Sequence, residues 1–114
     1  METYSKDENS LVSCKYKLLF YTKADAYYNS VNILGKRLFY LYSFDRRVLS
    51  YNADAQIIAV LPFSRAYTPH HVRAFLSEII GHDVDALMTG INVINRHEAI
   101  TTIEVNGIKI CKSL

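Results

Sequence analysis

The chain has 114 residues, half of them hydrophobic and 21% charged, which is the size and composition of one folded domain rather than of a disordered chain. Thirteen Lys and Arg residues against eleven Asp and Glu residues leave a formal charge of +2, too small to indicate nucleic-acid binding by itself. No apolar stretch approaches the roughly 20 residues of a membrane-spanning helix. The composition is unusual in its nine tyrosines. Their distribution is uneven as well, since eight of them lie at or before Tyr51.

Residues 1–10 are polar and non-periodic, which predicts a flexible leader before a single domain at residues 11–114. The leader lacks the basic and apolar regions of a signal peptide, so we expect a cytoplasmic protein with reduced cysteines. Cys14 and Cys111 could meet only if the first and last strands were neighbours. Because Cys14 falls among the apolar positions of its segment, we expect its thiol to face inward.

Residues 12–20 alternate between apolar and polar side chains, which predicts a half-buried strand. From Thr22 the apolar residues recur at helical spacing as far as Gly35, so we expect a first helix over residues 22–35, with Thr22 and Asp25 as its capping box. Its asparagines and serine are poor helix formers, and the helix would therefore depend on the packing of its tyrosine-bearing side.

Aromatic and aliphatic residues separated by turns follow this segment. They predict an antiparallel meander of three strands at residues 38–43, 48–51 and 56–61. The last strand is expected to end at Pro62, because proline has no amide hydrogen for the sheet.

A second helix is predicted over residues 68–81. Thr68 is its expected N-cap, Pro69 occupies the first helical position, and Gly81 ends the helix.

The remaining residues predict smaller elements. A short helical turn is expected from Asp83 to Gly90, and a further strand at residues 91–94. Residues 100–111 contain an Asn-Gly pair between two apolar runs, which is the strongest short-range signal of a β-hairpin.

Together these elements predict an α+β fold, with an antiparallel sheet of about five to six strands and two main helices packed on it. The residues expected in the core are Ile57, Ile58, Val60, Val72, Phe75, Leu76, Ile79, Ile103 and Val105.

The tyrosines of the central meander support the main functional hypothesis. Both sides of the strand at residues 38–43 are apolar or aromatic, and a domain of this size cannot cover every such surface. Because tyrosine and arginine are enriched in the energetic centres of protein interfaces, we predict a non-enzymatic module that binds another protein. An exposed tyrosine cluster would equally support a homodimer. The residues expected to contact the partner are Tyr40, Tyr42, Tyr51, Arg46 and Arg47.

Nucleic-acid binding is the alternative, because cations beside exposed aromatic rings hold single strands. The residues expected to bind phosphate in that case are Lys36, Arg37, Arg65, His70 and His71. Adjacent helical residues point about 100° apart, so His70 and His71 cannot both bind one metal ion unaided. No zinc-type spacing occurs, and we expect neither a metal site nor a cofactor.

Motifs of nucleophilic catalysis are absent from the sequence. No serine lies in a GxSxG elbow, and the four glycines are too dispersed for a phosphate-binding loop. An enzyme would need a pocket that gathers His71, His97 or Cys14. We therefore expect no catalytic residues.

One further pattern extends over about a third of the chain and consists of Tyr42-Ser43-Phe44, Val48, Phe63-Ser64, Thr68, His71-Val72 and Phe75-Leu76. This pattern resembles one in small uncharacterised proteins of phages and mobile elements of Gram-positive bacteria. The resemblance implies an accessory protein of a phage or mobile element, and it transfers no catalytic residue. It further implies an anti-defence protein that occupies the surface of a host protein, such as a defence nuclease, in the manner of CRISPR inhibitors.

Overall fold

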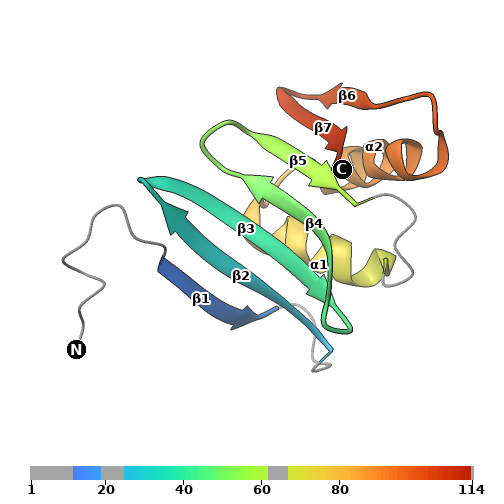
Figure 1. Cartoon of the computed structure of the whole chain (residues 1–114). Coiled ribbons are helices and arrows are strands. Elements are labelled where there is room, and N and C mark those ends of the chain that lie inside the picture. The colour runs from blue at the N-terminus through green and yellow to red at the C-terminus, as the bar shows by residue number, and fades with distance from the viewer. Residues whose placement is uncertain (1–11, 19–24, 62–66, 114) are drawn as a thin grey trace, which may run out of the picture.

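A computed structural model of the chain describes residues 12–18, 25–61 and 67–113. The described elements are β1 (Val12–Lys17), β2 (Ala26–Ile33), β3 (Lys36–Ser43), β4 (Arg46–Asn52), β5 (Ile57–Val60), α1 (Pro69–Ile79), α2 (Val84–Arg96), β6 (Thr102–Val105) and β7 (Ile108–Lys112) (Figure 1). Within these ranges, neither helix has the length and apolar character needed to cross a membrane. The expected leader, Thr22 and Pro62 lie outside the described residues.

The described strands form one sheet in the order β1-β2-β3-β4-β5-β7-β6. Neighbouring strands are antiparallel, except that β5 and β7 run parallel. The segment with α1, α2 and β6 supplies the long crossover connection that a parallel pair requires. The class is α+β, as predicted. The sheet, however, is mixed rather than purely antiparallel, and it has seven strands rather than five or six.

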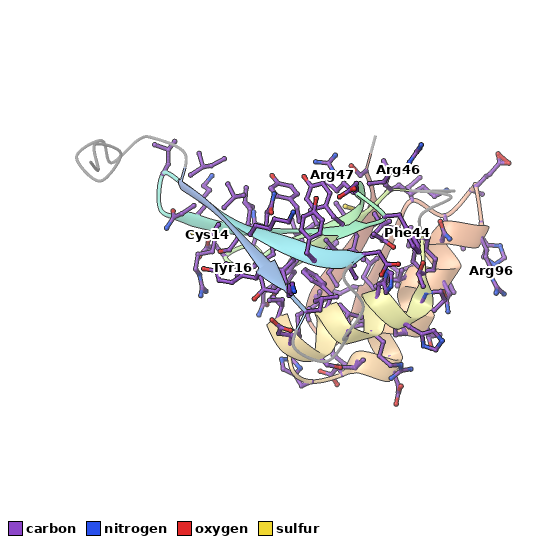
Figure 2. All side chains as sticks on the ribbon, turned by 90° about the horizontal axis from the view of Figure 1, so that it is seen from below. Cys14, Tyr16, Phe44, Arg46, Arg47 and Arg96 are labelled. Atoms are coloured by element: carbon purple, nitrogen blue, oxygen red, sulfur yellow. The ribbon has the colours of Figure 1, made fainter. Side chains whose placement is uncertain are left out.

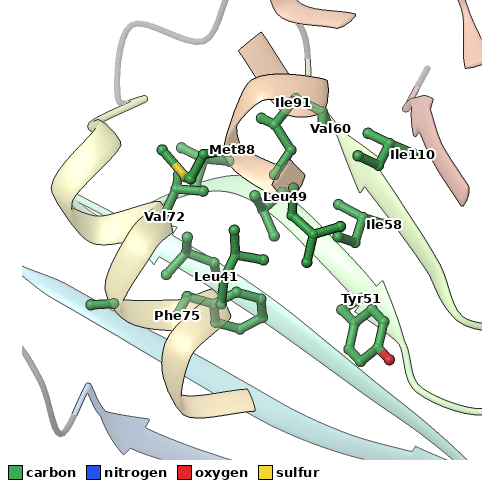
Figure 3. Close-up of a cluster of buried hydrophobic side chains, with 14 of the residues drawn as sticks. Leu41, Leu49, Tyr51, Ile58, Val60, Val72, Phe75, Met88, Ile91 and Ile110 are labelled. Atoms are coloured by element: carbon green, nitrogen blue, oxygen red, sulfur yellow. The ribbon is translucent and has the colours of Figure 1, made fainter. Parts of the chain in front are cut away.

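Both helices lie on one side of the sheet, and no described element covers the other side (Figures 1 and 2). The core fills the space between the two layers (Figure 3). The sheet contributes fully buried side chains such as Leu41, Leu49 and Ile58, while Phe75 of α1 and Ile91 of α2 meet them from the helix layer. Apolar burial therefore stabilises the attachment of the helices to one side of the sheet alone.

Most of the predicted core residues lie in this core. The buried ones are Ile58, Val60, Val72, Phe75 and Leu76. Those partly buried against the core are Ile79, Ile103 and Val105. Ile57 is instead partly exposed, because its register with Asn52 and Lys109 places it on the uncovered side of the sheet.

The predicted helix over residues 22–35 is wrong, because residues 26–33 form β2. This strand pairs with β1 on one side and β3 on the other, so both edges of its backbone are hydrogen-bonded. Tyr27, Tyr28 and Val31 are residues that favour strands. Their apparent helical spacing arises because apolar side chains occupy both sides of the strand. Tyr28 faces the helices, and Tyr27 faces away from them.

The predicted strand at residues 91–94 and the predicted helix end at Gly90 are also wrong, because α2 runs from Val84 to Arg96 without a break. Gly90 lies at a close contact instead. A Cβ atom at this position would lie 2.7 Å from Cδ1 of Ile110, so any larger residue would force this buried side chain to move.

Other expectations are confirmed. Thr68 is the N-cap of α1, and Pro69 occupies its first turn. The turn between β6 and β7 has positive φ at Asn106 (48°) and at Gly107 (88°), as the Asn-Gly pair predicted.

Candidate functional site

The uncovered side of the sheet, which we call the open face, is defined by strand register, because cross-strand partners point to the same side. Its described residues are Lys15 and Lys17 of β1; Tyr27, Asn29, Val31 and Ile33 of β2; Lys36, Leu38, Tyr40 and Tyr42 of β3; Arg47, Ser50 and Asn52 of β4; Ile57 and Ala59 of β5; Lys109 and Cys111 of β7; and Thr102 and Glu104 of β6.

Tyrosine rings and cations are packed together on this face, in a group we call the tyrosine cluster: Lys15, Tyr27, Tyr40, Tyr42 and Arg47. The rings of Tyr27 and Tyr42 are stacked, with centroids 5.0 Å apart and planes within 5°. Nζ of Lys15 lies 4.0 Å from the centre of the Tyr27 ring, and Cζ of Arg47 lies 5.4 Å from that of Tyr40. Cation–π attraction and ring stacking therefore hold the cluster in an ordered arrangement before any partner binds.

A β-bulge brings Arg47 into this cluster. Leu41 pairs with Leu49, but Tyr42 pairs with Arg47, so the register shifts by one residue. The extra residue, Val48, is fully buried, and Arg47 takes the position beside Tyr42 on the open face. Figure 2 shows Arg47 on the side of the sheet away from the helices.

The hydroxyl of Tyr27 is kept protonated at neutral pH. Partial burial raises the pKa of this phenol, and the neighbouring Asp45 carboxylate raises it further. The Tyr27 hydroxyl therefore stays able to donate as well as accept a hydrogen bond beside the Lys15 side chain.

The predicted protein-binding residues fall into two groups. Tyr40, Tyr42 and Arg47 lie together on the open face, and Arg46 is exposed at the start of β4. Tyr51 lies on the other side of the sheet, where it is only 7% exposed and its ring stacks on Phe39 beneath the helices. The inclusion of Tyr51 is corrected, because its register with Phe39 directs it into the core.

Sequence reasoning missed Tyr27 and Lys15 as members of the cluster. Tyr27 was assigned to a helix, and only strand pairing between β2 and β3 places it beside Tyr42. The alternation of Lys15 and Lys17 on β1 was the available signal, since it predicts one polar side for that strand.

The residues predicted to bind phosphate are not brought together. Lys36 and Arg37 begin β3, whereas His71 hydrogen-bonds to Ser43 at the opposite end of the same strand. His70 is exposed on α1, in the helix layer, and Arg65 lies outside the described residues. Lys36, Arg37, His70 and His71, the described residues of this set, therefore do not form a phosphate site together.

His71 belongs to a buried polar group that the sequence did not indicate. Its side chain is 1% exposed, and its Nδ1 lies 2.6 Å from Oγ of the fully buried Ser43. Its Nε2 lies 4.0 Å from Oδ1 of Asp25, and the Phe44 ring lies beside the imidazole. The hydrogen bond joins the first turn of α1 to the end of β3, across the two layers of the fold.

The residues that an enzyme would have to gather are far apart. Cys14 is exposed on β1, His71 is buried under β3, and His97 follows the end of α2. The expectation that Cys14 faces the core is wrong, because the helices do not cover this edge of the sheet (Figure 2). Cys111 of β7 is separated from β1 by four strands, so the two free thiols do not meet. No group of three or more metal-ligating side chains occurs among the described residues.

Comparison of the chain with known proteins finds no match. No protein-family model matches the sequence. No curated protein and no solved structure matches the chain significantly, so these comparisons leave the resemblance to phage and mobile-element proteins untested.

Proposed function

We propose that the protein is a non-enzymatic binding module whose open face contacts another protein, with the tyrosine cluster at the centre of the contact. The observation that carries the proposal is the stack of Tyr27 on Tyr42, with Lys15 and Arg47 laid against aromatic rings, on a sheet surface that no described element covers. Tyrosine and arginine dominate the energetic centres of interfaces. Rings that are already ordered lose little conformational entropy when a partner binds.

Nucleic-acid binding is the second candidate, favoured by the cations around the rings. Proteins that hold single strands offer free ring surfaces on which bases stack. Tyr27, however, lies between Tyr42 on β3 and Lys15 on β1, so both sides of its ring are already in contact. The ring of Tyr40 is contacted by Arg47. This arrangement favours contacts through ring edges and hydroxyl groups, which suit a protein surface better than a base stack.

The test is affinity capture from a host-cell lysate with immobilised protein, after nuclease treatment. Tyr42→Ala removes a ring from the cluster, and Tyr16→Ala is the matched control, because Tyr16 is 44% exposed on the other side of the sheet. We expect one protein to bind the native chain and the control but not Tyr42→Ala. Loss of all captured protein on nuclease treatment would favour nucleic acid instead, and equal capture by both variants would place the contact elsewhere.

The identity of the partner is a separate matter. The resemblance to phage and mobile-element proteins suggests a host defence protein, and that suggestion stays a prediction. Self-association through the same cluster is tested by sedimentation of the purified protein. A dimer that Tyr42→Ala dissociates would replace the foreign partner with a second copy.

A further inference from the structure

The half of the open face that carries the tyrosine cluster is basic. Lys15 and Lys17 of β1, Lys36 of β3 and Arg47 of β4 all belong to it by register. Within the described strands the acidic residue is Glu104, and it lies on the opposite half of the sheet. There it faces Lys109 across the β6–β7 pair, so the two charges offset each other.

The other described carboxylates lie in turns and helices. Asp54 accepts a hydrogen bond from the backbone amide of Arg37 (2.6 Å), and Asp85 pairs with Arg73 in the helix layer (2.8 Å). Asp45, in the β3–β4 turn, lies close enough to Tyr27 to raise its pKa and is the carboxylate at the margin of the cluster. A chain with a formal charge of only +2 thus places three cations, Lys15, Lys17 and Arg47, beside the partly buried tyrosines of its open face.

We propose that the partner of the open face presents an acidic protein surface, whose carboxylates meet Lys15, Lys17 and Arg47 while an apolar part packs on the tyrosine rings. This inference rests on the proposed function, because it names the chemistry of the same contact. Charge complementarity of this kind steers association and excludes wrong partners. A second copy of the chain fits poorly, since the same cations would face one another across a symmetric interface.

The packing of the cations is compatible with carboxylate binding. A guanidinium group stacked on a ring keeps its N–H edge free, and this edge forms paired hydrogen bonds with a carboxylate. Arg47, whose Cζ lies 5.4 Å from the centre of the Tyr40 ring, can therefore keep this contact while it binds an acidic side chain. A nucleic-acid base would instead have to displace Lys15 to stack on the ring of Tyr27, because Tyr42 already contacts the other side of that ring.

The experiment measures binding of two probes of similar length, a 20-residue polyglutamate peptide and a 20-nucleotide oligothymidylate, by NMR titration at about 50 and 200 mM salt. The variant Lys17→Gln/Arg47→Gln removes two charges from the open face. Arg73→Gln/Arg96→Gln removes two from the exposed surface of the helices and is the matched control. We expect the peptide to shift amide signals of β1–β4, and the first variant to weaken it by about two- to fivefold per charge, while the control stays within about twofold.

Three outcomes would overturn the inference: no binding of the peptide at low salt, shifts confined to the helices, or tighter binding of the oligonucleotide with its base protons shifted by stacking. The captured partner then separates this inference from the proposed function. If Tyr42→Ala abolishes capture but Lys17→Gln/Arg47→Gln leaves it unchanged, the protein contact stands and its acidic character is wrong. If neither variant affects capture, both proposals fail.

Discussion

The hydrogen bond between Ser43 and His71 gives a prediction about stability at the level of one side chain. Both residues are buried, and Oγ of Ser43 on β3 lies 2.6 Å from Nδ1 of His71 on α1. Ser43→Ala would leave the Nδ1 of a buried imidazole without its partner, and we expect the free energy of unfolding to fall by about 1–3 kcal/mol. Urea denaturation followed by circular dichroism measures this.

Ser50→Ala is the matched control, because Ser50 lies on the open face and pairs with Tyr40. A surface substitution of this kind should change stability by no more than about 0.5 kcal/mol. Equal effects of the two alanines would show that the Ser43–His71 bond contributes nothing specific.

Tyr28 makes stability sensitive to alkaline pH. Burial, and after it the neighbouring Glu78, raises the pKa of this phenol from 10.0 to about 12. Because the folded value lies above the unfolded one, this contribution is fully present below pH 10 and is lost as the pH rises from 10 towards 12. The free energy of unfolding should therefore fall in that window, by at most about 1.4 kcal/mol per pH unit for one proton.

The check is urea denaturation at pH 9.0 and above, in the native chain and in Tyr28→Phe. The variant should lose less stability between about pH 10 and 12, since it has no phenol to ionise at this position. A constant difference between the two proteins across the whole range would contradict the assignment. Below pH 10 the difference is expected to be constant, which provides the internal control.

At the level of the elements, the packing of α2 against β6 and β7 leaves little room for a side chain at Gly90. Gly90→Ala would place a Cβ 2.7 Å from Cδ1 of Ile110 and 3.1 Å from Cγ2 of Val105. The overpacking should lower the free energy of unfolding by about 1–3 kcal/mol, although alanine favours helices more than glycine does. Thr89→Ala, at the exposed neighbouring position, should be close to neutral.

A double-mutant cycle identifies the cause. Ile110→Val removes the Cδ1 atom that the new Cβ would meet, so Gly90→Ala should cost less in that background than in the native chain. Equal costs in the two backgrounds would mean that the helix is not limited by this contact.

The elements that local chemistry determines were predictable, and those that pairing determines were not. Thr68 and Pro69 signal the start of α1 by themselves, as the Asn-Gly pair signals the final hairpin. Tyr27 and Val31 have helical spacing but lie in β2, because two neighbouring strands bond its backbone on both edges. Glycine is the residue type that commonly ends a helix, but Gly90 lies inside α2. The close approach of β7 to this position explains its presence there.

The candidate site was predictable for similar reasons only in part. Alternation along β3 puts Tyr40 and Tyr42 on one side, which a single strand is enough to show. Tyr51 could not be placed in the same way, because the bulge between β3 and β4 shifts the register by one residue. Tyr27 could be assigned to the cluster only once β2 was known to lie beside β3.

Across the whole molecule, the protection of backbone amides from hydrogen exchange should depend on the position of each strand in the sheet. β3, β4 and β5 have neighbours on both edges and are attached to the core, whereas β1 and β6 end the described sheet. Hydrogen exchange followed by NMR should therefore find the slowest amides in β3–β5 and the fastest strand amides in β1 and β6. Equal protection of β1 and β3 would show that another segment covers that edge.

The parallel pairing of β5 with β7 has a consequence for how the chain acquires its structure. β2–β5 can pair as they are synthesised, because short turns connect each strand to the next. Ile57 of β5 pairs with Lys109 of β7 only after about fifty intervening residues have been synthesised and have folded. Until then the outer edge of β5 is an unpaired strand that can join another nascent chain. The final hairpin therefore acts as a cap on a half-built sheet, and variants that delay its docking should aggregate during synthesis even when the finished protein is stable.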